Sequence, residues 1–196
     1  MLEEGLTSRT SPGRLRRFLS GVVSQPLSMG AVAPSSRYLA DLMVADMGPG
    51  SRVIELGAGT GVVTQAILDA GVSPKDLIVI EQNEGMAELL KERFPESTVL
   101  RANAVSLRHH IAGLAGPADF IASGLPLLLF PAKRKARVLM QAFGALKPGG
   151  YFHQFTYAGR CPVERSVLRS LDLEASLLRF TPFNLPPAFV YRLQRR

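Results

Sequence analysis

Three alternate glycines follow a short apolar run near the middle of the chain. The run Val53-Ile54-Glu55-Leu56 leads directly into Gly57-Ala58-Gly59-Thr60-Gly61, and a helical pattern begins at Val62. Glycines at this spacing let the backbone turn tightly and let a ligand lie against it, because no Cβ atoms intervene. The N-terminus of the following helix directs free N–H groups at the same place. The segment therefore predicts a strand, a turn and a helix that together hold a small ligand.

The chemistry of this turn differs from that of a nicotinamide dinucleotide site. Such a site has the spacing Gly-x-Gly-x-x-Gly, whereas this chain has Gly-x-Gly-x-Gly with Val62 at the next place. Glu55 would oppose a pyrophosphate, but it suits a ligand with a positive ammonium group, such as the amino acid end of S-adenosylmethionine. The residues expected to bind this cofactor here are Glu55, Gly57, Ala58, Gly59 and Gly61.

Three further strand-like runs end in groups that could contact the same nucleoside. One run ends in Glu81-Gln82, where an acid commonly accepts both ribose hydroxyls. The next leads to Asn103-Ala104, whose amide side chain and backbone N–H could bind an adenine edge. The third ends in Ser123-Gly124. Ligands of open α/β sheets bind at the carboxyl ends of the strands, so these groups are expected to meet there.

The elements that must position these groups alternate in the order of βαβ units. This alternation predicts an α/β, Rossmann-like sheet that is mostly parallel, with an antiparallel pair at the C-terminal end and helices before the sheet. The expected strands are Arg52–Leu56, Asp76–Glu81, Thr98–Arg101, Asp119–Ser123, Tyr151–Thr156, Glu174–Phe180 and Ala188–Leu193. The expected helices are Ser36–Met47, Val62–Asp69, Glu84–Phe94, Ala132–Leu146, ended by Lys147-Pro148-Gly149-Gly150, and Val163–Ser170.

Composition restricts the class of protein. The 196 residues suit one domain, and the single cysteine, Cys161, indicates a reducing compartment. The first five residues lack the basic start of an export signal. The formal charge is +7, but residues 51–100 carry −4 and the rest of the chain carries +11. The basic part indicates a polyanionic partner, either nucleic acid or an anionic membrane surface.

A basic amphipathic pattern occupies the N-terminal region. Ser11 and Pro12 suit a helix start, and an apolar stripe with helical spacing follows, flanked by arginines. This pattern fits either a helix that faces the core or one that lies in a membrane interface. The residues that would contact the membrane are Arg14, Leu15, Arg17, Phe18, Leu19 and Val22.

The succession of motifs resembles the class I S-adenosylmethionine-dependent methyltransferases over residues 30–157. More finely, it resembles the bacterial phospholipid N-methyltransferases over nearly the whole chain. Beyond the glycine turn, the residues that carry this likeness are Pro26, Gly30-Ala31-Val32-Ala33-Pro34-Ser35-Ser36, Ser123-Gly124-Leu125-Pro126-Leu127-Leu128, Phe155-Thr156-Tyr157, Asn184-Leu185-Pro186-Pro187-Ala188 and Val190-Tyr191-Arg192.

The resemblance implies a function and an organisation. These enzymes methylate phosphatidylethanolamine up to three times, giving phosphatidylcholine, and an N-terminal amphipathic helix docks on the membrane. The chain is then expected to be a single methyltransferase domain over 1–196, with a membrane-binding helix in 1–25, a cap helix in 26–50 and a catalytic core in 51–196. We expect a monomer in the cytoplasm, peripheral on an anionic membrane surface, with a phospholipid substrate and no nucleic-acid partner.

Methyl transfer to an amine is an in-line displacement, so positioning should dominate catalysis. The sequence offers no His/Asp or Cys/His base pair, and His109, His110 and His153 lack metal-ligand spacing, so no metal is expected. A methylated ammonium favours aromatic faces and carbonyl oxygens. The groups expected to contact the amine are therefore Tyr157, Tyr38 and Gly124, although both tyrosines could equally be packing residues. Arg192 could meet the lipid phosphate, and the basic run 133–137 fits a solvated helix face or, alternatively, a clamp on the headgroup.

Two other functions fit parts of the sequence. Ribosomal RNA adenine N6-dimethyltransferases have a similar turn, but their fourth strand ends in Asn-Leu-Pro-Tyr, where this chain has Ser123-Gly124-Leu125-Pro126 followed by Leu127. Leu127 offers no aromatic ring on which a splayed adenine could stack. A noncatalytic membrane-binding module is the other alternative, and the intact set of glycines and acids disfavours it.

Overall fold

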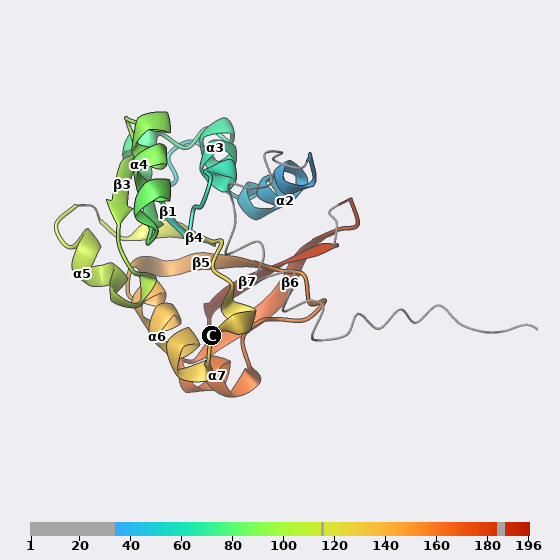
Figure 1. The fold of residues 1–196 in the computed structure, drawn as a ribbon. Helices are drawn as coiled ribbons and strands as arrows, with labels where there is room; N and C mark the ends of the chain where they lie inside the picture. Colours follow the sequence, from blue (N-terminus) through green and yellow to red (C-terminus); the bar gives the residue numbers. More distant parts are fainter. Residues whose placement is uncertain (1–33, 115, 184–186) are drawn as a thin grey trace, which may run out of the picture. The chain divides into compact units, whose positions relative to one another are not determined.

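A seven-stranded sheet organises the protein in the computed structural model, which describes residues 34–114, 116–183 and 187–196. The strand order is β3-β2-β1-β4-β5-β7-β6 (Figure 1). Neighbouring strands from β3 to β5 are parallel, and β7 pairs antiparallel with both β5 and β6. The predicted fold class, a mostly parallel Rossmann-like sheet with an antiparallel C-terminal hairpin, is confirmed. The strands are β1 Val53–Leu56, β2 Leu77–Glu81, β3 Thr98–Arg101, β4 Ala118–Ser123, β5 Leu146–Thr156, β6 Leu173–Thr181 and β7 Ala188–Arg195.

Helices cover both faces of the sheet, as the apolar composition of the central strands requires. A parallel strand that is buried on both faces does not alternate polar and apolar residues, and all four residues of β1 are buried. The α-helices are α2 Pro34–Val44, α3 Val62–Asp69, α4 Glu84–Arg93, α5 Leu107–Ile111, α6 Ala132–Phe143 and α7 Arg165–Ser170; the short 3₁₀ turns are η1 Pro74–Asp76, η2 Ala104–Ser106 and η3 Leu127–Leu129.

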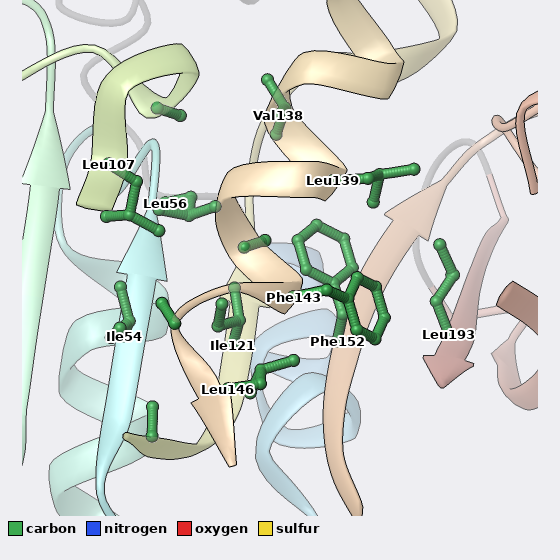
Figure 2. Close-up of a cluster of buried hydrophobic side chains, with 14 of the residues drawn as sticks. Ile54, Leu56, Leu107, Ile121, Val138, Leu139, Phe143, Leu146, Phe152 and Leu193 are labelled. Atoms are coloured by element: carbon green, nitrogen blue, oxygen red, sulfur yellow. The ribbon is translucent and has the colours of Figure 1, made fainter. Parts of the chain in front are cut away.

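Two apolar clusters fill the spaces between the sheet and its helices. The first joins β1, β4, β5 and β7 to α5, α6 and α7, and Figure 2 shows part of it around Phe143 and Phe152. Their rings are stacked with centroids 6.3 Å apart. The second cluster joins the other face of the sheet to α2, α3 and α4. The sheet is therefore clamped from both sides, which fixes the positions of its strand ends.

The end of α6 and the start of β5 differ from the prediction. The expected helix Ala132–Leu146 ends at Phe143 instead, where the Gly144 N–H donates to the Met140 carbonyl. Leu146 already pairs with Ala118 of β4, and the next pair is Tyr151 with Phe120. Lys147 to Gly150 therefore bulge between two rungs of the ladder and do not simply stop the helix. The prediction was wrong because a parallel strand partner competes with helix propensity at this point.

Candidate active site

The carboxyl ends of β1 to β4 surround a pocket with about 340 Å³ of empty volume, part of it open to solvent. Of the predicted site residues, it brings together Gly57, Glu81, Gln82, Asn103 and Ala104. Glu55, Ala58, Gly59, Gly61 and Ser123 do not line this pocket, and they lie in or beside the turns around it. Lining residues that the sequence analysis missed are Ile80, Ala102, Leu125, Phe130, Arg134 and Val138.

The glycine turn has the tight geometry that its sequence predicts. Gly61 is the N-cap of α3 with φ +82° and ψ 24°, in the left-handed region. A Cβ at Gly61 would lie 2.6 Å from the ring of Phe94, which follows α4. The Gly59 N–H donates to a Glu81 carboxylate oxygen at 2.9 Å. The turn is thus tied both to the α4 side of the protein and to the end of β2.

The turn after β4 contacts the glycine turn backbone to backbone. The Gly124 N–H donates to the Leu56 carbonyl at 2.8 Å. Ser123 is fully buried, and its hydroxyl accepts the Leu125 N–H at 3.4 Å. Ser123 therefore shapes the turn, while the next residue but one, Leu125, supplies the pocket wall.

Glu55 lies beneath the glycine turn with only 1% of its surface exposed. The Thr64 hydroxyl, in the first turn of α3, donates to its carboxylate at 2.6 Å. Burial and the nearby charge of Glu81 raise the pKa of Glu55 from 4.5 to about 7, while the Thr64 hydrogen bond acts in the opposite direction. A cation bound above the turn would favour the ionised form of this carboxylate.

Glu81 ends β2 and accepts two backbone hydrogen bonds. The Gly59 N–H donates to Oε2 at 2.9 Å, and the Asn83 N–H donates to Oε1 at 2.8 Å. Each carboxylate oxygen has a second lone pair, so both can still accept a hydroxyl. Asn83 also caps α4, because its side chain accepts the Met86 N–H. The carboxylate is therefore held at the rim of the pocket by the structure around it.

One wall of the pocket is apolar and lies opposite the polar strand ends. The wall consists of Leu125, Phe130 and Val138, and the Arg134 guanidinium lies 4.0 Å from the centroid of the Phe130 ring. Asn103 caps η2 by accepting the Val105 N–H with its side chain at 3.1 Å. A flat base fits between such a wall and a polar edge. The apolar run after Pro126 contains Phe130 alone of these three residues, so the sequence carried no signal for the wall as a whole.

The candidate amine-binding residues occupy different surroundings. Tyr157 follows β5, packs at the edge of the second apolar cluster and meets Phe155 edge to face at 5.4 Å. Tyr38 is 54% exposed on α2, and its ring centroid lies 6.3 Å from that of Phe183. Gly124 is at the carboxyl edge beside Gly57. Tyr38 lies in α2, Gly124 directly follows β4 and Tyr157 directly follows β5.

Arg192 lies among charged groups and away from the strand ends. In β7 it pairs with His153 of β5, three rungs before Thr156, and its guanidinium donates to Asp46 at 2.5 Å. Arg179 donates to the other oxygen of the same carboxylate at 3.1 Å. Burial opposes ionisation of Asp46, but the hydrogen bond from Arg192 and the surrounding positive charges leave its pKa below 3.8. In this structure Arg192 fastens α2 to the sheet through Asp46. We therefore no longer expect Arg192 to contact a lipid phosphate.

The structure also shows the surroundings of two other polar residues, His153 and Lys135. His153 is fully buried, and its Nδ1 lies 2.9 Å from the Met43 carbonyl; burial is the main cause of its lowered pKa. Its Nε2 is buried without a hydrogen-bond partner among the described residues and lies 3.8 Å from the Asp46 carboxylate, so the expected satisfied histidine is found only at Nδ1. Lys135 was expected on a solvated face, but it is only 3% exposed and its ammonium contacts Glu164 at 2.6 Å. That expectation was wrong because α7 packs over this side of α6.

The predicted membrane helix, with Arg14, Leu15, Arg17, Phe18, Leu19 and Val22, lies outside the described residues. The cap helix is present in part as α2. Within the described part of the chain, no helix combines the length and apolar character needed to cross a membrane.

The pocket fits a nucleoside that carries a cationic amino acid. The apolar wall suits the base, Glu81 suits the ribose hydroxyls, and the glycine turn leaves open a backbone cradle above Glu55. The residues that would hold S-adenosylmethionine are thus present on one edge of the sheet. When bound, this cofactor supplies a methyl group on a positively charged sulfur.

Comparisons with known proteins agree with this reading of the pocket. The model of the methyltransferase domain family matches residues 53–150. An ornithine lipid N-methyltransferase from Singulisphaera acidiphila is 33% identical over 89% of this chain and 92% of its own length. A TehB-like S-adenosylmethionine-dependent methyltransferase from Corynebacterium glutamicum has the same fold, with a TM-score of 0.63 and 14% identity over 95% of this chain and 100% of that one.

A third protein with the same fold was solved with its cofactor bound. Magnesium protoporphyrin IX methyltransferase from Synechocystis, solved with bound S-adenosylmethionine, aligns with a TM-score of 0.60 and 13% identity over 99% of this chain and 87% of that one. The family model covers half of the chain, and the lipid methyltransferase is matched over nearly its full length. The chain therefore belongs to the methyltransferase domain family and is a class I methyltransferase that uses S-adenosylmethionine.

Proposed function

We propose that this enzyme methylates the amine of a membrane lipid headgroup, with phosphatidylethanolamine as the acceptor and phosphatidylcholine as the final product. The observation that carries the proposal is the 33% identity to an ornithine lipid N-methyltransferase over 89% of the chain. That relative acts on an amine-bearing lipid by its name, and phosphatidylethanolamine also carries a primary amine. The two acceptors share the reacting group and differ in the rest of the headgroup.

The reaction makes few chemical demands on the protein. A primary amine has an ordinary pKa of about 10.4, so it arrives mostly protonated and must lose a proton before it attacks. Among the residues that line the pocket there is no histidine, and its carboxylate, Glu81, is held by two backbone N–H groups. Loss of the proton to water therefore suits this site. The remaining work is to align the nitrogen with the methyl group, which is positioning.

The groups we assign to the acceptor lie near the ends of β4 and β5. The Gly124 carbonyl lies in the turn after β4, and Tyr157 lies just after the end of β5. Each methyl transfer makes the amine a softer, more diffuse cation, and aromatic faces attract such cations. Tyr157 and Tyr38 would therefore hold the partly methylated headgroup between successive transfers.

The membrane surface is part of the proposal because the substrate does not leave it. Residues 12–25 carry the amphipathic pattern that would lie in the interface, and the chain outside residues 51–100 has a formal charge of +11. We propose a monomer that works on the cytoplasmic face of the membrane, with anionic lipids as its electrostatic partner and no nucleic acid.

The RNA alternative receives no support from the pocket. Leu127, which takes the place of the stacking aromatic residue, is the first residue of η3 and is 1% exposed in the core. A side chain buried there cannot stack on a base that has left a helix. The lipid proposal therefore fits this strand end better than adenine methylation does.

Vesicles that contain one amine lipid at a time test the proposal. The full-length protein is incubated with S-adenosylmethionine and vesicles of phosphatidylethanolamine or of ornithine lipid, each diluted in phosphatidylglycerol, and the headgroups are resolved by mass spectrometry. We expect mono-, di- and trimethylated phosphatidylethanolamine. Methylation of ornithine lipid alone would show that phosphatidylethanolamine is not the acceptor, but the conclusion that the enzyme methylates an amine-bearing lipid would stand. Absence of both products from a protein that binds the cofactor would overturn the proposal.

A further inference from the structure

Large apolar side chains are exposed together on the β6–β7 hairpin and the adjoining helix α2. They are Tyr38, Leu177, Phe180 and Phe183, with exposed fractions of 54%, 53%, 49% and 77%. We call these four residues the hairpin patch. Grouped exposed aromatic residues on one structural unit mark an interaction surface more often than scattered apolar residues do.

The rings of the hairpin patch lie on both faces of the hairpin. Phe180 pairs with Phe189 across the two strands, and their ring centroids are 4.8 Å apart. Leu177 pairs with Tyr191, two residues further along β7, so it shares this face. Phe183, just beyond the end of β6, instead meets Tyr38 of α2 at 6.3 Å. A flat protein partner would cover one face, whereas a bilayer can surround both.

The hairpin extends beyond the edge of the sheet where the pocket opens. Thr156, the last residue of β5, pairs with Phe189, and β6 and β7 continue past this rung through the pair of Thr181 and Ala188. The extension therefore lies on the carboxyl side of β5, the same side as Gly124 and Tyr157. Figure 1 shows the hairpin next to α2. Phe180 and Phe183, at this end of the hairpin, would meet a bilayer while the ends of β4 and β5 face the headgroups.

The charge of this region suits an anionic interface. Residues 175–196 contain no acid and four arginines. Two of these arginines, Arg179 and Arg192, share the single negative charge of Asp46, so one positive charge remains uncompensated there. Arg195 lies at the other end of the hairpin, paired with Leu173, so the net positive charge belongs to the hairpin as a whole. Exposed aromatic and apolar residues on a segment of net positive charge suit the boundary between the headgroups and acyl chains of an anionic membrane.

We propose that the hairpin patch is a second membrane-docking element, which inserts into the interfacial layer of an anionic bilayer and holds the strand ends of β4 and β5 against the headgroups. This inference rests on the proposed function, and it concerns described residues separate from the N-terminal amphipathic pattern. We infer that lipid covers the hairpin patch, because rings on both faces of the hairpin and a segment without acids match a bilayer boundary better than a folded protein surface.

Tryptophan substitution gives a direct test, because the chain has no tryptophan of its own. The full-length Phe183→Trp protein is mixed with vesicles of phosphatidylcholine and phosphatidylglycerol, which carry no amine that this reaction could methylate. We expect its emission to shift to shorter wavelength and to be quenched by brominated acyl chains. The matched control is Leu114→Trp, 53% exposed in the loop after α5, and its emission should not change.

A charge variant measures the strength of docking. The double variant Phe180→Glu, Phe183→Glu should lower the vesicle partition coefficient about tenfold or more, since two aromatic side chains lose their apolar contact. Leu114→Glu, measured in the same flotation assay, should leave the coefficient unchanged. Thermal melting in buffer checks that both variants are folded.

Several outcomes would overturn the inference. Emission of Phe183→Trp that stays constant while the protein floats with vesicles would show that the hairpin does not insert. A shift of the emission to shorter wavelength in buffer without vesicles would also count against docking. A shift that grows with protein concentration would mean that a second copy covers the hairpin patch, and a shift that does not depend on concentration would mean that another segment of this chain covers it. Because these vesicles contain no substrate, they measure docking apart from methylation. Insertion here, together with no methylation of phosphatidylethanolamine or ornithine lipid vesicles, would leave docking intact and overturn only the proposed function.

Discussion

The Cβ position of Gly124 points at the carbonyl oxygen of Gly57, and an added methyl group there would lie only 2.5 Å from that oxygen. Two turns from different parts of the chain therefore touch backbone to backbone at the centre of the carboxyl edge. Gly57 also lines the pocket. Any side chain at Gly124 must push the glycine turn away from β4 and reshape the cofactor cradle.

The Gly124→Ala protein should bind S-adenosylmethionine more than tenfold more weakly and lose about 1–3 kcal/mol of stability. Both effects are expected because the added methyl group would meet backbone atoms, which can move only if the two turns shift apart. Calorimetric titration and chemical denaturation measure the two effects. Gly85→Ala is the matched control, since its Cβ would meet only the Asn83 side chain at 3.6 Å inside α4. Normal cofactor affinity in Gly124→Ala would contradict this close contact.

The buried Glu55 should make stability depend on pH. Its pKa is about 7 in the folded protein against 4.5 ordinarily. Between these values the folded state holds a proton that the unfolded state has lost, so the stability that this group contributes is full below pH 4.5 and is lost as pH rises to 7. Glu55→Gln removes this titration, so its stability relative to the wild type should rise across that window in urea denaturation.

Thr64→Val is a second probe of the same carboxylate. The Thr64 hydroxyl favours the ionised form of Glu55, so its removal should extend the pH-dependent loss of stability above pH 7. Equal pH slopes in the wild type, Glu55→Gln and Thr64→Val would contradict the assignment of this titration to Glu55.

Glu81 should contribute to cofactor binding through its fixed carboxylate. Glu81→Ala removes the acceptor of the Gly59 and Asn83 N–H groups, and we expect about a tenfold to hundredfold rise in the Kd for S-adenosylmethionine. Titration calorimetry measures the Kd, and Glu84→Ala, at the exposed start of α4, should leave it unchanged. An unaltered Kd in a folded Glu81→Ala protein would remove Glu81 from the cofactor site.

Asp46 should fasten α2 through Arg179 and Arg192. Asp46→Asn leaves two guanidinium groups without their anion, so we expect a loss of about 1–3 kcal/mol and faster hydrogen exchange in α2. The pKa of Asp46 lies below 3.8, so its contribution is present above that pH and disappears as the pH falls through the folded value. Asp41→Asn, exposed on α2, is the control; a loss of the same size there would contradict the pairing.

Much of the sheet could be predicted because its strands are short apolar runs bounded by glycines and acids. The positions of Gly57, Glu81 and Asn103 at one pocket follow from strand order alone, since parallel strands bring their ends to one edge. The end of α6 could not be predicted, because the pairing of Leu146 with Ala118 is a contact between residues distant in sequence.

The polar pairs also escaped prediction. Nothing near Arg192 in the sequence indicates Asp46, 146 residues earlier, and Lys135 finds Glu164 only because α7 returns over α6. The apolar pocket wall combines Leu125, Phe130 and Val138 from a turn, a loop and a helix. Side chains that meet through tertiary packing carry no periodic signal, so a reading of local patterns misses them.

A competition for one labelled methyl group tests the central claim most directly. The full-length protein receives methyl-labelled S-adenosylmethionine together with vesicles of phosphatidylethanolamine and phosphatidylglycerol and with ribosomal RNA, and the label is then separated into lipid and RNA. We expect label in methylated headgroups, dependent on Glu81, and none in RNA. Label in RNA with unmodified lipid would contradict that claim.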